Sequence, residues 1–184
     1  AMDRWIRRPY GKVWAASQSP VAHMGVKGKP IEFGMWAQCA LAEYCTAVGR
    51  CVSSLLLDIS KAFENVRHEV VTKHGLQLSF NPMLLKWLIT SFQVPRRIAF
   101  QGVMSDEVSA SQSIVPGSAH ADLMMMIMVL PVVLQVKALW PFCQLGAVVD
   151  DLQICVHGPE LFVVEKMGEI SRFVMEEFET VMLL

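Results

Sequence analysis

The stretch that most restricts the fold is LGAVVDDLQICVHG, residues 145–158. Two short runs of mostly apolar, often β-branched residues flank the adjacent carboxylates Asp150 and Asp151, a pattern typical of two strands joined by a tight turn. Such turns usually prefer Asn-Gly or Asp-Gly, because their central residues need positive φ, whereas two neighbouring Asp side chains repel each other. The stretch therefore predicts an antiparallel hairpin. Turn preference alone does not explain the two adjacent Asp residues at its turn.

The composition predicts a buried core. The 184 residues are 53% hydrophobic and 18% charged, which argues against disorder. The longest apolar run, from Leu123 to Val136, is shorter than the ~20 residues that span a bilayer and contains Pro131, so we expect a buried helix and no membrane. Five cysteines lack CxxC spacing, and the amino terminus has no secretion signal pattern, which favours an intracellular protein, cytoplasmic or nuclear.

The order of the hydrophobic periods predicts an α+β fold. We expect residues 1–34 to be irregular and the later elements to form an antiparallel sheet with helices packed on one face. Expected helices cover 35–48, 61–75 (with Ser60 as cap), 82–92 (with Asn81 as cap), 123–140 and 159–184. Expected strands cover 51–58, 96–103 and 107–115 (joined around residues 105–106), and the two arms of the 145–158 hairpin.

The carboxylates at the strand ends are candidate metal ligands. Asp is a common turn former, so an ordinary turn is one explanation for Asp150 and Asp151. The other is a divalent cation, which outweighs the repulsion between them, with Asp58 at the end of the 51–58 strand as a third oxygen donor. Mg²⁺ suits a site with few carboxylates whose other ligands are water and substrate phosphates.

These residues also carry a family resemblance. LLLDISKAFENVRHEVV, residues 55–71, resembles the first catalytic motif of reverse transcriptases from non-LTR retrotransposons, and VVDDL, residues 148–152, resembles their aromatic-x-Asp-Asp box. Between them, SIVPGSAHADLMMMIMVL, residues 113–130, resembles the Gly-Ser motif that leads into a long palm helix. GVKGK, residues 25–29, is similar to the fingers motif, and the motifs stand in family order.

The resemblance implies a reverse-transcriptase-like fingers and palm fold without a thumb. Residues 1–50 would form a fingers-like segment and residues 51–184 a palm-like core, with residues 75–115 partly fingers-like. The implied activity is RNA-directed DNA polymerase, a nucleotidyl transfer by two Mg²⁺ or Mn²⁺ ions, in a fragment of a retroelement polyprotein. The implied partners are an RNA or DNA template with its primer and deoxynucleoside triphosphates.

The resemblance also assigns roles to single residues. Asp58 and Asp150 would bridge the metal ions, and Asp151 would be the more peripheral carboxylate. The implied substrate-binding residues are the Ile59 carbonyl, Phe63 under the sugar, Gly117 and Ser118 beside template and nucleotide, and Lys27 and Lys29 at the triphosphate. Ordinary roles stay open for these: Phe63 also fits a helix's apolar face, Gly117 and Ser118 also fit a turn and a cap, and loop lysines are usually solvated.

Two departures from the family keep other functions open. Val148 replaces the aromatic of the Asp-Asp box, and Pro116 replaces a Gln and lacks its donors. Whether the chain is an enzyme is therefore left undecided by the sequence. The alternatives are a catalytically inactive, decayed remnant that binds nucleic acid, and a non-enzymatic protein-interaction domain whose Met-rich helix packs on a partner.

Overall fold

A computed structural model describes residues 10–18, 31–118, 120–148 and 151–182 of the chain. The helices are α2 (Gly11–Gln18), α3 (Ile31–Ala47), α4 (His68–Gln77), α5 (Pro82–Gln93), α6 (Ala121–Leu139) and α7 (Glu160–Met182). The strands are β1 (Cys51–Asp58), β2 (Ala99–Phe100), β3 (Val103–Met104), β4 (Gln144–Val148) and β5 (Asp151–Gly158). The predicted α+β class with a small antiparallel sheet is confirmed.

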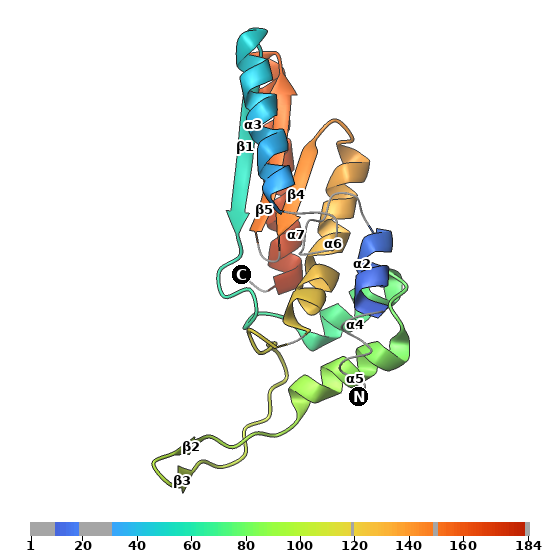
Figure 1. Ribbon diagram of the computed structural model, residues 1–184, viewed down its shortest axis with the longest axis vertical. Helices are drawn as coiled ribbons and strands as arrows, with labels where there is room; N and C mark the ends of the chain where they lie inside the picture. Colours follow the sequence, from blue (N-terminus) through green and yellow to red (C-terminus); the bar gives the residue numbers. More distant parts are fainter. Residues whose placement is uncertain (1–9, 19–30, 119, 149–150, 183–184) are drawn as a thin grey trace.

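The main sheet is antiparallel, with the strand order β1-β5-β4 (Figure 1). The predicted 145–158 hairpin forms β4 and β5, and the predicted 51–58 strand forms β1, which pairs with β5 along its whole length. Because side chains alternate along a strand, the register fixes which residues share a face. Leu152, Ile154 and Val156 of β5 are at most 2% exposed on one face, and Asp151, Gln153 and Cys155 lie on the other.

Helices cover both faces of this sheet. Helices α6 and α7 pack with the apolar face in one hydrophobic core. Helix α3 crosses the polar face in contact with β1 and β5, and the Nε2 of its Gln38 lies 3.5 Å from where a Cβ on Gly146 would stand. The expectation of helices on one face is therefore incomplete, since α3 lies on the second face.

Helix α6 is the centre of the core. With 19 residues it is long and apolar enough to cross a membrane, by length and composition only. However, 56% of its most apolar 18-residue stretch is buried inside the fold. Pro131 lies within the helix and does not interrupt it. The four methionines of this helix, Met124, Met125, Met126 and Met128, are at most 2% exposed, so they serve this chain's own core rather than its surface.

The helix expected to begin at residue 61 begins later. Residues 60–65 form turns, Arg67 forms an isolated β-bridge with Gln112, and Lys61 has a φ of +49°, outside the right-handed helical region. Helix α4 starts at His68 after Arg67, and Ser60 caps nothing. The expected helix is wrong here because residues 59–67 hydrogen bond to a distant segment, which local periodicity cannot reveal.

Glycine 75 also differs from expectation. It lies inside α4 rather than past its end, in close contact with Leu85 of α5. Helix α5 forms as predicted, because the Asn81 Oδ1 accepts hydrogen bonds from the backbone N–H groups of Met83 and Leu84.

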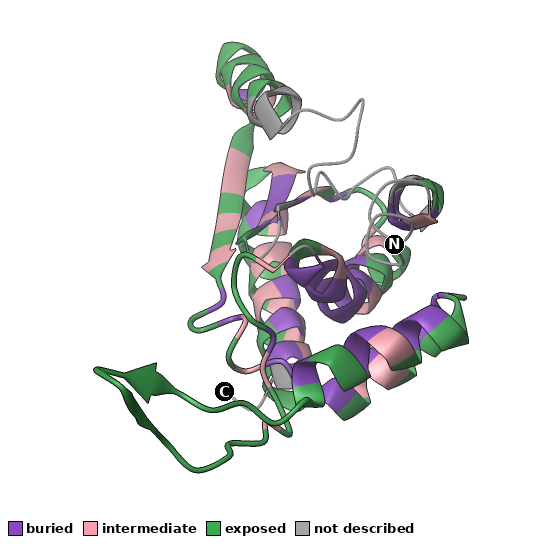
Figure 2. Ribbon diagram, turned by 60° about the horizontal axis from the view of Figure 1, so that its bottom comes forward, coloured by how far each residue is buried: buried purple, intermediate pink, exposed green. Residues whose placement is uncertain are grey.

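The two long strands expected over 96–115 are wrong. Only β2 and β3 form, and the turn lies at Gln101 and Gly102, with φ of +48° and +79°, rather than around residues 105–106. Positive φ at both central residues is the conformation of a tight hairpin turn, which Gly favours. Figure 2 shows this hairpin projecting from the body with its residues exposed.

The amino-terminal stretch is less irregular than expected. Residues 11–18 form α2, anchored by Trp14, whose Nε1 donates to the carbonyl of Leu78 at 3.1 Å and whose ring meets Phe80 edge to face. The backbone N–H of Asn81 donates to the Tyr10 hydroxyl at 2.6 Å. These contacts with residues far along the chain stabilise a helix that the local sequence does not predict.

Candidate active site

Two of the predicted acidic ligands meet at the edge of the sheet. Asp58 ends β1, Asp151 begins β5, and the two are partners in the antiparallel register. Side chains of directly opposite residues project from the same face, with Cβ atoms about 4.5–5.5 Å apart. Both residues are exposed, so water and solutes reach them. Two like charges placed this way repel each other unless a cation lies between them.

The third predicted ligand, Asp150, lies outside the residues that the structure describes. Val148, the last residue of β4, pairs with Asp151 on the opposite side from Asp58. Among the described residues no group of three or more His, Cys, Asp or Glu side chains forms a metal cluster. The described part of this corner offers two carboxylates, Asp58 and Asp151. Carboxylate oxygens are the ligands that Mg²⁺ accepts in a site completed by water and phosphates.

The face that carries these carboxylates is polar and partly covered. Ser54 and Cys155 are register partners on it, and the Ser54 Oγ lies 3.1 Å from the Cys155 Sγ. Leu56, between Ser54 and Asp58 on this face, is 70% exposed. The surface beside the carboxylates is thus open at the Asp58 end and covered by α3 further along.

The loop after Asp58 holds two more predicted residues. Ile59 is buried, and its carbonyl accepts a hydrogen bond from the Ala62 N–H at 3.1 Å, which leaves one lone pair of that oxygen for another ligand. Phe63 is half-buried and packs against the hydrophobic core. The structure thus gives Phe63 a packing role, and a sugar contact remains a prediction.

Backbone hydrogen bonds join this loop to the segment that carries the Gly-Ser motif. The Ser113 N–H donates to the Val66 carbonyl and the Ile114 N–H to the Phe63 carbonyl, both at 2.8 Å. Figure 1 shows this segment leaving the projecting hairpin, turning beside the loop after β1 and leading into α6. The structure therefore brings together the two segments that the sequence predicts to surround the substrate.

Gly117 and Ser118 occupy a turn before α6. Gly117 has a φ of +75° and open space where a Cβ would stand, so its place needs a residue that adopts the left-handed conformation easily. The Ser118 Oγ is buried and has no hydrogen-bond partner in the part of the chain that the structure describes. Lys27 and Lys29 lie outside the described residues.

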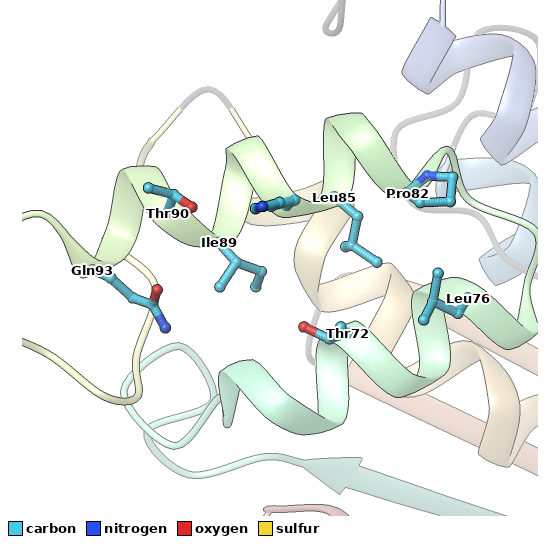
Figure 3. Close-up of a pocket in the computed structure, with 8 residues that line it drawn as sticks. Thr72, Leu76, Pro82, Leu85, Ile89, Thr90 and Gln93 are labelled. Atoms are coloured by element: carbon cyan, nitrogen blue, oxygen red, sulfur yellow. The ribbon is translucent and has the colours of Figure 1, made fainter.

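A groove of about 360 Å³ lies between α4 and α5 (Figure 3), and neither Asp58 nor Asp151 is among its lining residues. Leu76 and Thr72 of α4 and Leu85 and Ile89 of α5 line it with apolar and weakly polar groups, and Lys86 is its only charged lining residue. No carboxylate, histidine or cysteine is among its lining residues.

Sequence reasoning missed one polar contact beside the site. His68 is 3% exposed and its Nε2 lies 2.7 Å from the Ser113 carbonyl oxygen. His68 was visible in the sequence within the first motif, but its partner was not, because Ser113 is distant in the chain.

No protein-family model matches this sequence, and no curated protein matches it either.

Proposed function

We propose that this chain performs template-directed nucleotidyl transfer, as an RNA-directed DNA polymerase with a fingers and palm fold of reverse-transcriptase type. The observation that supports this most is the register pairing of Asp58 with Asp151, since it joins two of the three motif carboxylates at one solvent-exposed corner. The order of the motifs along the chain is the second support.

The carboxylates of this corner would suit divalent cations. Asp58, Asp151 and Asp150 would hold two Mg²⁺ or Mn²⁺ ions, which when bound lower the pKa of a primer 3′-hydroxyl and neutralise charge on the leaving pyrophosphate. Asp58 and Asp151 supply hard anionic oxygens in a pairing that is unfavourable without a cation. The mutual repulsion of these carboxylates would favour a bound cation.

The neighbouring segments would shape the substrate site. Phe63 and Ile59 hold the loop after Asp58 against the core, which limits the movement of that carboxylate. Gly117, with nothing within 4 Å of a built Cβ, leaves room for template or nucleotide to approach the backbone. Lys27 and Lys29 would contact the triphosphate, and binding of a primer-template would position the 3′-hydroxyl by proximity.

A primer-extension assay tests the proposal. The full chain is incubated with an RNA template annealed to a DNA primer, all four deoxynucleoside triphosphates and either Mg²⁺ or Mn²⁺. We expect extension, and we expect Asp58→Asn, Asp150→Asn and Asp151→Asn each to lower its rate by at least about a hundredfold, the loss typical of one preorganised electrostatic contact. Asp106→Asn, on the projecting hairpin, is the matched control and should retain the rate.

The outcomes separate the competing functions. Extension that survives Asp58→Asn contradicts the proposal. Primer-template binding that weakens with salt but yields no extension supports the inactive nucleic-acid-binding remnant, because phosphate contacts make affinity fall with salt. Absence of both favours the protein-interaction domain.

A further inference from the structure

Ser113 adopts a backbone conformation that a non-glycine residue rarely takes. Its φ of +77° lies in the left-handed region, where the Cβ crowds the backbone. Such strained residues persist only where the surrounding contacts hold them, and they gather near functional sites. Ser113 stands four residues before Gly117, at the start of the segment that carries the Gly-Ser motif.

Hydrogen bonds hold both backbone groups of Ser113. Its N–H donates to the Val66 carbonyl at 2.8 Å, and its carbonyl oxygen lies 2.7 Å from the Nε2 of His68. The next residue, Ile114, donates its N–H to the Phe63 carbonyl and is 1% exposed. The strained residue is therefore fixed at the point where its segment meets the loop after Asp58.

His68 is the one side chain in this arrangement, and both of its ring nitrogens have partners. Its Nδ1 lies 3.4 Å from the Nε2 of Gln93, at the end of α5. The two contacts agree on one tautomer of the neutral ring, in which Nε2–H donates to the Ser113 carbonyl and Nδ1 accepts from the Gln93 amide. His68 thereby joins α4, the end of α5 and the segment that begins at Ser113.

We propose that His68 is a positioning residue, whose Nε2–H holds the Ser113 carbonyl and so fixes the 113–118 segment against the loop that follows Asp58. The role of that segment in nucleotide binding rests on the proposed function, whereas the positioning itself does not. Two experiments therefore address the two parts separately.

Amide hydrogen exchange tests the positioning. We expect His68→Leu, which keeps the bulk and loses the donor, to speed exchange of the Ser113 and Ile114 amides by about tenfold, as loss of one buried hydrogen bond should. His68→Gln keeps an N–H at a similar reach and should stay within about threefold of the parent. The β1–β5 ladder amides serve as the internal reference and should keep their protection.

His74→Leu is the matched control. His74 is a second buried histidine of α4 and is 8% exposed. The groups that act on its ring are the backbones of Ile127 and Met128 and the charges of Lys73 and Glu177, not Ser113. Its replacement should leave the exchange of both amides unchanged relative to the ladder. Equal acceleration in His74→Leu, or no acceleration in His68→Leu, would overturn the proposal.

Steady-state extension kinetics test the consequence for the substrate. If the 113–118 segment borders the incoming nucleotide, His68→Leu should raise its KM by about tenfold and change kcat by less than about threefold, because binding geometry is lost and the carboxylates remain. His68→Gln should restore KM. An unchanged KM in a His68→Leu protein with faster exchange overturns the link to the nucleotide, and a parent chain without extension defeats the proposed function while the exchange result still decides the positioning.

Discussion

Asp58 and Asp151 face each other as the last register pair between β1 and β5. Like charges directly opposite on one face of a sheet destabilise the pairing, and a cation bound between them offsets the repulsion. The pairing makes Asp151 a direct neighbour of Asp58, whereas Asp150 lies outside the described residues. The roles that the family resemblance implies for these two hairpin residues can therefore be compared by mutating each one.

Removal of either charge should change the stability of the metal-free chain. We expect Asp58→Asn and Asp151→Asn each to raise the free energy of unfolding by up to about 1 kcal/mol at low ionic strength and neutral pH, because each relieves one cross-strand repulsion. Thermal unfolding in a chelating buffer measures this gain. In the double variant the gain should be less than the sum of the two, because both single changes remove the same repulsion.

Added Mg²⁺ or Mn²⁺ should produce the opposite order of stability. The parent should gain melting temperature with cation concentration, since an ion that binds only the folded state stabilises it by mass action. Asp58→Asn and Asp151→Asn should lose most of this gain, and Asp106→Asn should keep it. A cation-dependent shift of equal size in all three variants would show that the ion binds elsewhere.

The sequence predicted the sheet at this corner well, because strand periodicity is local. The short apolar, often β-branched runs on either side of Asp150 and Asp151 predicted both arms of the hairpin, and β5 buries Leu152, Ile154 and Val156 in the core. The Asn81 cap was equally visible, since the capping side chain stands beside the N–H groups that it accepts from. What these predictions share is that the decisive contacts lie within a few residues.

The misplaced elements depend on contacts between distant residues. The loop at residues 59–67 has an apolar pattern that suits a helix, but the carbonyls of Phe63 and Val66 accept from Ile114 and Ser113 instead. Likewise, nothing near Trp14 in the sequence indicates that its Nε1 donates to the Leu78 carbonyl. Tertiary contacts thus override the local helical pattern at residues 59–67. At residues 11–18 they stabilise a helix that the local sequence does not predict.

His74 should make stability depend on pH. Burial lowers the pKa of its imidazole below the ordinary 6.5, so near and below pH 6.5 the unfolded chain binds a proton that the folded chain excludes. The stability of the fold with neutral His74 is therefore fully retained above about pH 6.5. Below that pH the free energy of unfolding falls as the pH drops toward the lowered pKa of His74. Urea unfolding between pH 5 and 8 measures the slope, and His74→Leu should flatten it; the same slope in the variant would assign it to other groups.

The cysteines should divide sharply in reactivity. Cys39 and Cys51 are exposed, whereas Cys45, Cys143 and Cys155 are buried. Burial raises the pKa of the Cys143 thiol to about 11, so at pH 8 it lacks the thiolate that reacts. A thiol reagent should modify two cysteines quickly in the native protein and all five after denaturation, and the Cys39→Ser, Cys51→Ser double variant should show no fast phase. A fast phase that remains in the double variant would contradict the packing around the buried thiols.

Two glycines in helices should respond oppositely to the same substitution. A Cβ on Gly75 would lie 2.7 Å from a methyl carbon of Leu85, which is 1% exposed, so Leu85 must shift and Gly75→Ala should cost about 1–3 kcal/mol from overpacking, offset by about 1 kcal/mol of helix propensity. Gly168 of α7 is exposed with nothing within 4 Å of such a Cβ, and Gly168→Ala should stabilise by about 0.5–1 kcal/mol. Chemical denaturation measures both changes. Leu85→Val should reduce the cost of Gly75→Ala because it frees the space between α4 and α5, and a Gly75→Ala variant that is as stable as Gly168→Ala would show that the two helices do not approach this closely.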